Sequence, residues 1–141
     1  MNEIYFACSI RGGRDDAELY KELVTYLKTK STVLTEIFAD GKLTAHGSPG
    51  TSSDIYKKDM AWVKQADAII AEVTNPSLGV GYEIAKAEEW DKPILVLFRN
   101  DGTKRLSAMI DGSSKIRVVE YQRMNEAYGA IDSFIESISV K

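Results

Sequence analysis

The sequence predicts an α/β protein with one open, five-stranded parallel sheet covered by helices on both faces. Segments with strand character alternate with segments of helical periodicity along the whole chain of 141 residues. Two of the strand segments, Ala68–Val73 and Pro93–Phe98, are apolar at almost every position. Strands that are apolar on both faces are typical of parallel sheets, in which helical crossovers cover both sides. The architecture expected is flavodoxin-like or Rossmann-like.

The first half of the chain supplies two strands, one helix and a long loop. Glu3–Ser9 is a predicted strand, and the turn Ile10–Arg14 leads into a helix that starts near Asp15, where negative charge is favoured. The apolar positions of this helix recur at spacings of three and four: Tyr20, Leu23, Val24 and Leu27. Thr32–Ile37 is rich in β-branched residues and predicts a strand. Phe38–Ser52 contains three glycines and a proline, so we expect a loop, and loops of this length are often functional.

The second half continues the alternation. A helix is expected from Ser53, with one face formed by Ile55, Tyr56, Met60 and Val63. The buried strand Ala68–Val73 follows, then a turn, the helix Gly79–Trp90 and the buried strand Pro93–Phe98. The remaining expected segments are a polar loop at 99–104, a helical turn at Leu106–Ile110, a strand at Ile116–Glu120 and a helix at Met124–Ile138.

Composition excludes several classes of protein. Hydrophobic residues make up 44% and charged residues 28% of the chain, which is ordinary for a folded domain. The net charge of −3 offers no basic field for a nucleic-acid polymer or an anionic membrane. The single cysteine, Cys8, excludes an intrachain disulfide and a Cys-based zinc site. Without a basic leader or an apolar run of about 18 residues, we expect a cytoplasmic protein.

The loops at the carboxyl ends of the strands are the expected site, because ligands of open α/β sheets bind there. Ser9–Arg14 has two glycines and two arginines before a helix, a combination suited to a phosphate, although a tight turn with two surface arginines is an equally acceptable interpretation. It is not a P-loop. Gly79-Val-Gly81 lacks the third glycine of a dinucleotide fingerprint, so no cofactor is expected.

Two carboxylates and a phenol are candidates for chemistry. Asp59 shares a helical face with apolar residues, and either a local partner or a polar cleft would explain a carboxylate there. Glu83 lies early in the helix Gly79–Trp90, where favourable helix-dipole electrostatics is the commoner role. Tyr5 either packs in the core or orients a carboxylate. Two carboxylates in one crevice are the minimum for cleaving a glycosidic bond with retention. The only histidine, His46, supports neither a metal site nor a triad.

Four blocks, taken in order, resemble the 2'-deoxynucleoside 5'-monophosphate N-glycosidases of the nucleoside 2-deoxyribosyltransferase superfamily. They are Tyr5–Arg14 (YFACSIRGGR), Asp59 within KKDMAWVKQAD, Val73–Glu83 (VTNPSLGVGYE) and Leu106–Ile110 (LSAMI). The match runs from about residue 4 to 120, and on this basis residues 1–141 are interpreted as one domain of that kind. Ala7-Cys8 and Ile37 depart from the family pattern, so the preference for a base stays open.

The resemblance implies hydrolysis of the N-glycosidic bond of 2'-deoxynucleoside 5'-monophosphates to free base and 2-deoxyribose 5-phosphate. Glu83 would be the nucleophile that forms a covalent sugar ester, with Tyr5 and Asp59 orienting it, binding the sugar and assisting proton transfer. The substrate-binding residues implied are Ser9, Ile10, Arg11, Gly12, Gly13, Arg14, Ser77, Gly79, Ser107, Ala108 and Met109. No metal is implied.

Two other functions and one assembly remain as hypotheses. A nucleoside 2-deoxyribosyltransferase would transfer the sugar to a second base, but its unphosphorylated substrates would not need Arg11 and the serines. A non-catalytic nucleotide-binding module would leave the combination of Tyr5, Asp59 and Glu83 unexplained. Leu106–Ile110 is a mostly apolar turn that is awkward to expose, and the resemblance implies a homodimer in which Ser107 completes the site of the partner subunit.

Overall fold

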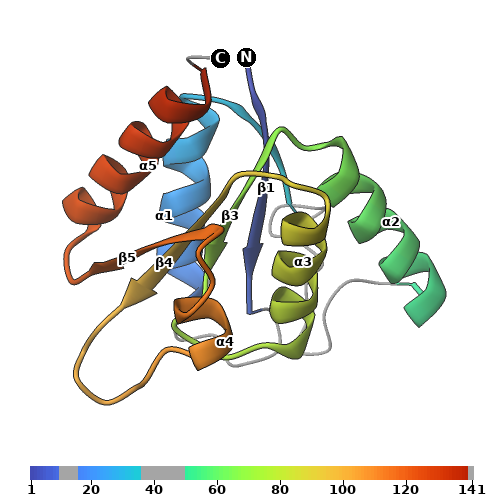
Figure 1. The fold of residues 1–141 in the computed structure, drawn as a ribbon. Helices are drawn as coiled ribbons and strands as arrows, with labels where there is room; N and C mark the ends of the chain where they lie inside the picture. The colour runs from blue at the N-terminus through green and yellow to red at the C-terminus, as the bar shows by residue number, and fades with distance from the viewer. Residues whose placement is uncertain (10–15, 36–49, 140–141) are drawn as a thin grey trace.

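The structure, a computed structural model, describes residues 1–9, 16–35 and 50–139. Strands and helices alternate along the chain (Figure 1). The elements are β1 (Glu3–Cys8), α1 (Ala17–Lys28), β2 (Thr32–Leu34), α2 (Ser52–Gln65), β3 (Ala68–Glu72), α3 (Leu78–Glu89), β4 (Ile94–Arg99), α4 (Ala108–Asp111), β5 (Ile116–Tyr121) and α5 (Met124–Ser139).

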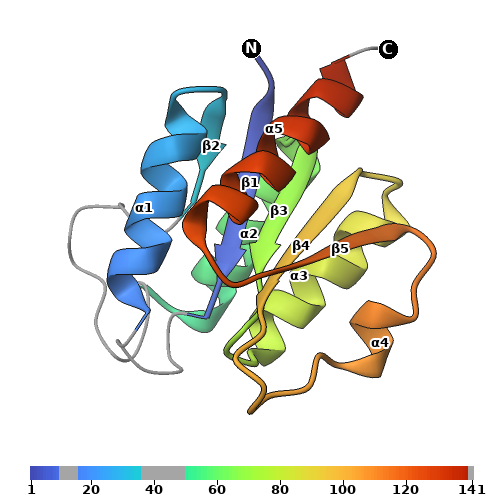
Figure 2. The same ribbon diagram turned by 90° about the vertical axis from the view of Figure 1, so that its left-hand side faces the viewer.

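The five strands form one sheet in the order β2-β1-β3-β4-β5, and every neighbouring pair is parallel. Helices α1 and α5 cover one face, and α2, α3 and α4 lie on the other (Figures 1 and 2). The predicted α/β class, with helices on both faces of a parallel sheet, is therefore confirmed. No helix in the described part of the chain is long and apolar enough to cross a membrane.

Strand β1 divides its side chains between two cores. Ile4 and Phe6 pack with α1 and α5, whereas Tyr5 and Ala7 pack with α2 and α3. This division follows from the two-residue period of a strand, which sends successive side chains to opposite faces. Strands β3 and β4 are buried along almost their whole length, as their apolar sequences predict. The alternation therefore directs the Tyr5 side chain into the layer between β1, α2 and α3.

Two expectations from the sequence need correction. The strand expected at Thr32–Ile37 ends at Leu34 in the structure, and residues 36 and 37 lie outside the described residues. Tyr56 was expected on the buried face of α2, but half of its surface (51%) is exposed. Its ring packs edge-on against Tyr82 of α3, with 6.0 Å between centroids, so it contacts the neighbouring helix and not the sheet.

Candidate active site

The centre of the candidate site is a hydrogen bond between Tyr5 and Glu83. The Tyr5 hydroxyl donates to Oε2 of Glu83 at 2.5 Å, joining β1 to the second turn of α3. Tyr5 is only 3% exposed and Glu83 is half-buried. A charge-assisted hydrogen bond from a packed phenol fixes the direction of a carboxylate more firmly than a bond from a mobile surface group. The predicted pairing of a phenol with a carboxylate is thus present in the geometry.

Asp59 lies on α2, the helix next to this pair. It is half-buried and stands one helical turn before Trp62 and Val63. The Trp62 ring is tilted against the Tyr5 ring with 6.3 Å between their centroids, and Lys58 Nζ lies 5.3 Å from the Trp62 ring centroid. Because residues three and four apart share a helical face, Asp59 is placed on the side of α2 that turns toward β1 and α3.

The start of α3 has features that suit an anion. Ser77 is the N-cap, and its hydroxyl oxygen accepts the backbone N–H of Val80 at 3.3 Å. A Cβ added at Gly79 would lie 3.8 Å from Ser77 Oγ, an ordinary contact distance, so the first turn of the helix is uncrowded there. Helix N-termini favour negative ligands through their N–H groups and dipole. The structure therefore places Ser77 and Gly79 together at a point suited to a phosphate.

Of the glycine-rich segment Ser9–Arg14, which was predicted to bind phosphate, the structure describes only Ser9. Ser9 follows β1 directly and is 4% exposed. The five other residues predicted for this segment lie outside the described residues: Ile10, Arg11, Gly12, Gly13 and Arg14. Ser9 is thus placed beside the carboxyl end of β1, where the site was expected.

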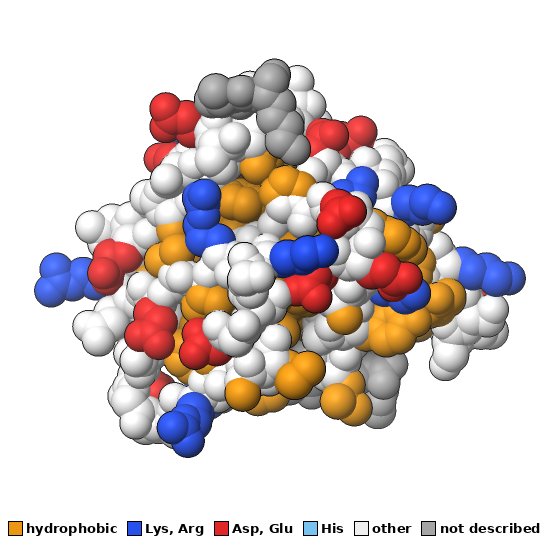
Figure 3. Space-filling model, in the orientation of Figure 1, with side chains coloured by type: hydrophobic (Ala, Val, Ile, Leu, Met, Phe, Trp, Pro, Cys, Tyr) orange, Lys and Arg blue, Asp and Glu red, His pale blue; other side chains and the backbone are white. Residues whose placement is uncertain are grey.

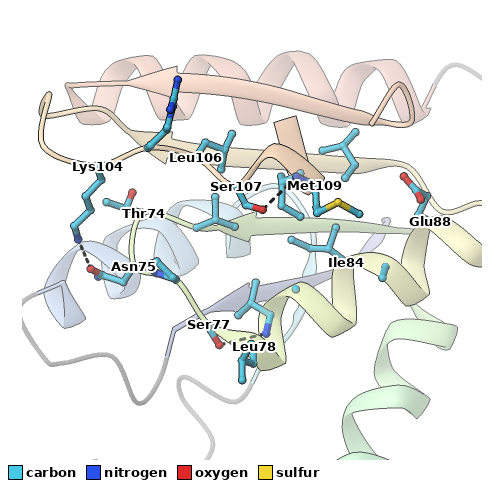
Figure 4. Close-up of a pocket in the computed structure, with 18 residues that line it drawn as sticks. Thr74, Asn75, Ser77, Leu78, Ile84, Glu88, Lys104, Leu106, Ser107 and Met109 are labelled. Atoms are coloured by element: carbon cyan, nitrogen blue, oxygen red, sulfur yellow. Dashed lines mark hydrogen bonds between the residues drawn. The ribbon is translucent and has the colours of Figure 1, made fainter. Parts of the chain in front are cut away.

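A cavity of about 670 Å³ lies on the other side of α3. One face of α3, the turn at 73–77, the segment at 104–107 and α4 line it, and Ser77, Ser107 and Met109 are among its residues (Figure 4). Ser107 caps α4 by accepting the Met109 backbone N–H at 3.2 Å, and Ala108 is exposed beside it. Neither Tyr5 nor Glu83 lines this cavity.

Within one chain, α3 lies between Ser107 and the carboxylates. Helix α2 packs on β1, α3 on the central strands, and α4 on the edge strand β5. The helices of this face are therefore ordered α2, α3, α4 (Figure 1). The structure brings Tyr5, Glu83 and the Asp59 face of α2 together, and it leaves Ser107 on the far side of α3.

The sequence interpretation missed a buried carboxyl group, Glu72, at the end of β3. Its Oε1 accepts the Thr74 backbone N–H at 2.8 Å, and its Oε2 accepts the hydroxyls of Thr74, at 2.9 Å, and Tyr121. Burial raises the pKa of Glu72 above its usual value, although these hydrogen bonds lower it in part. Burial, together with the charges of Glu72 and Glu83, also raises the pKa of the neighbouring Cys8 thiol. A charged residue inside an otherwise apolar strand was the signal available in the sequence.

Glu72 is expected to make stability depend on pH. Its pKa is higher in the folded than in the unfolded chain, so the folded state binds more protons. Its contribution to stability is then fully present below the unfolded pKa and is lost as pH rises through the folded pKa. Glu72→Gln, the uncharged analogue, should therefore gain stability relative to wild type as pH rises.

Urea unfolding between about pH 4 and 8 measures this difference. Glu136→Gln, on an exposed position of α5, is the matched control and should track wild type at every pH. A constant difference between Glu72→Gln and wild type across the range would contradict the assignment.

Comparison with known proteins identifies the family. An open parallel sheet with helices on both faces defines the class as an α/β protein, and the Tyr5–Glu83 hydrogen bond joins β1 to α3 in it. The model of the nucleoside 2-deoxyribosyltransferase family matches residues 4–129. The chain belongs to this family, which confirms the resemblance found in the sequence.

Curated relatives are similar over most of their length. The chain is 43% identical over 139 residues to the 5-hydroxymethyl-dUMP N-hydrolase of Homo sapiens, covering 95% of this chain and 79% of that protein. It is 47% identical over 123 residues to the Mus musculus protein of the same name, covering 84% and 71%. Among solved structures, the Clostridium botulinum CMP N-glycosidase BcmB superposes with a TM-score of 0.68 at 18% identity, covering 93% and 98%. The last comparison supports the fold.

Proposed function

We propose that the chain hydrolyses the N-glycosidic bond of 2'-deoxynucleoside 5'-monophosphates, releasing the base and 2-deoxyribose 5-phosphate. The observation that carries the proposal is the hydrogen bond from buried Tyr5 on β1 to Glu83 on α3, the helix that starts beyond the carboxyl end of β3, where α/β proteins bind ligands. The names of the human and mouse relatives support it, since 5-hydroxymethyl-dUMP is a deoxynucleoside monophosphate and the identity is 43% and 47%.

Glu83 acts as the nucleophile in this proposal. Its carboxylate attacks the anomeric carbon, the bond from that carbon to the base nitrogen breaks, and a sugar ester of Glu83 forms. A deoxyribosyl centre lacks the electron-withdrawing 2'-hydroxyl, so its cationic transition state forms more readily. The leaving base receives a proton, for which Asp59 is the assigned donor. Water then attacks the same carbon, regenerating the carboxylate, while Asp59 takes up the proton of the water.

The substrate phosphate supplies binding energy away from the reacting carbon. Ser9, Ser77 and Gly79 are assigned to it, together with Arg11 and Arg14 of the segment that lies outside the described residues. A hydroxyl that accepts one backbone N–H, as that of Ser77 does, can still donate its own hydrogen to a phosphate oxygen. Such remote contacts hold the anomeric carbon against Glu83 and raise the rate without a metal.

Product chromatography tests this function. The chain is incubated with 5-hydroxymethyl-dUMP, the four common deoxynucleoside monophosphates, their nucleosides and the matching ribonucleotides. We expect free base and 2-deoxyribose 5-phosphate from one or more of the deoxynucleotides, with nucleosides and ribonucleotides much poorer. Equal rates on nucleosides and monophosphates would contradict the phosphate assignment. A high yield of new nucleoside in the presence of a second base would identify a transferase, and binding without turnover would identify a non-catalytic module.

The same proposal includes a homodimer in which Ser107 acts in the partner's site. Leu78 and Met109 are 97% and 83% exposed, and both border the cavity between α3 and α4. Hydrophobic side chains reach the surface on the face that carries these helices (Figure 3). A second subunit packed here would cover them. It would also explain how Ser107, which α3 separates from Glu83 in one chain, contributes to a site that contains Glu83.

Mixing two defective variants tests the shared site. Glu83→Ala lacks the nucleophile and Ser107→Ala lacks the hydroxyl donated to the partner, so a mixed dimer contains one intact site. Random exchange of equal amounts makes half the dimers mixed, so activity should return to about a quarter of the wild-type level. The assay is base release after subunit exchange, with exchange followed by mass spectrometry. Mixed dimers without recovered activity would show that each site is built within one chain.

A further inference from the structure

Asp16 occupies the N-cap position of α1 but does not cap its helix. An aspartate at this position normally accepts an N–H from the first turn of its own helix, which stabilises the helix. Here both carboxylate oxygens contact other segments. Oδ1 accepts from Arg99 Nη2 at 2.8 Å and Oδ2 accepts from Asn75 Nδ2 at 2.7 Å. The residue is only 9% exposed, so these are long-range contacts in a mostly buried place.

Asn75, which donates to Asp16, lies two residues before the N-cap of α3. Its Nδ2 also donates to the Tyr20 hydroxyl at 3.1 Å, and its Oδ1 accepts from Lys104 Nζ at 2.6 Å (Figure 4). An asparagine amide has two N–H donors and one carbonyl oxygen, and all three are engaged. The side chain therefore fixes the turn that leads to Ser77 and the first turn of α3.

Arg99, the last residue of β4, connects this strand to Asp16 and to the turn before α3. The hydrogen bond with Asp16 raises the pKa of its guanidinium, and the Arg99 backbone N–H donates to Thr74 Oγ1 at 2.8 Å. Asp16 thus lies between Arg99 and the turn at 74–75, with Lys104 as the second cation. The Asp16 carboxylate is thus paired with the Arg99 guanidinium, and Lys104 is held at the other end of the Asn75 amide.

We propose that Asp16 and Asn75 are positioning residues that hold the N-terminal ends of α1 and α3 together and thereby set the geometry in which the substrate phosphate is bound. The inference rests on the proposed function. The Asp16 side chain makes these contacts and does not cap its own helix. Asn75 is followed by Pro76 and Ser77, and Ser77 is assigned to the phosphate. Neither side chain touches the sugar or the base in this account.

Exchanging the donor and the acceptor provides the test. Asp16→Asn leaves one acceptor oxygen for two donors, so its amide N–H faces either Asn75 Nδ2 or Arg99 Nη2, and Asn75→Asp places two carboxylates together. The double variant Asp16→Asn/Asn75→Asp restores a donor opposite an acceptor. For each protein, kcat/KM is measured with a deoxynucleoside monophosphate and with its nucleoside. We expect the ratio of these two values to fall about 10- to 100-fold in each single variant, since small misplacements cost that much, and to recover largely in the double variant.

The control is another hydrogen bond between α1 and a distant segment, the contact of Tyr26 with Asp132 on α5. Tyr26 donates to both carboxylate oxygens of Asp132 on α5, at 2.7 and 2.8 Å, and Asp132→Asn should leave the monophosphate-to-nucleoside ratio at the wild-type value. Single Asp16 and Asn75 variants that keep the wild-type ratio would overturn the inference. So would equal losses on both substrates, which indicate a loss of folded protein. A wild-type chain without preference for the monophosphate would overturn the proposed function instead.

Discussion

Glu83→Ala is expected to lower kcat for base release by about 10⁴-fold or more, the scale seen when an enzyme loses its nucleophile. The carboxylate forms its bond to the anomeric carbon only in the reaction itself. Binding of the substrate in the ground state should therefore change little, because the phosphate contacts are made elsewhere. Base release measures the first effect, and calorimetric titration with a deoxynucleoside monophosphate measures the second.

Glu89→Ala is the matched control for this experiment. Glu89 is an exposed carboxylate on the same helix, where it pairs with Lys86 at 3.3 Å. Such surface pairs contribute little, so activity should stay near the wild-type value. A loss of less than about tenfold in Glu83→Ala would show that Glu83 is not the nucleophile.

Tyr5→Phe is expected to have the second-largest effect, a fall in kcat of about 10²-fold. The variant keeps the ring packed among β1, α2 and α3 but removes the hydroxyl that donates to Glu83. Glu83 then loses the contact that fixes its direction, while the phosphate contacts and KM should change little. Steady-state kinetics with a deoxynucleoside monophosphate separates the two parameters.

Tyr82→Phe is the control for the loss of a phenol hydroxyl. Tyr82 precedes Glu83 on α3, and its exposed hydroxyl lies 3.5 Å from that of Tyr56. Its removal should leave kcat near wild type. If Tyr5→Phe behaves in the same way, the hydrogen bond to Glu83 has no role in turnover and Tyr5 is a core residue only.

Local patterns predicted the strands and helices, and the position of Tyr5 follows from how these elements pack. The two-residue period of β1 sends Tyr5 to the face of α2 and α3, and the parallel order brings the end of β1 beside the end of β3. The capped start of α3 then places Glu83 in the second turn of a helix that packs on β1 and β3. These relations follow from strand alternation and right-handed crossovers, which short stretches of sequence already encode.

Contacts between distant side chains could not be predicted in this way. The sequence places Asp16 at a helix start where negative charge is favoured, and nothing local indicates that it meets Arg99, 83 positions away. Tyr56 has the spacing of a core residue, yet α2 turns it toward Tyr82. The helical pattern gives a face but not the angle at which the helix packs.

The stereochemistry of trapping by methanol tests the central claim, that Glu83 attacks the anomeric carbon, most directly. The chain is given a β-configured deoxynucleoside monophosphate in buffer that contains methanol, and proton NMR identifies the sugar products. Methanol that opens a Glu83–sugar ester arrives on the face that the base left, because two displacements restore the starting configuration. We expect methyl 2-deoxyribose 5-phosphate as the β anomer, and none of it with Glu83→Ala. The α anomer alone would show direct attack by solvent and contradict the claim.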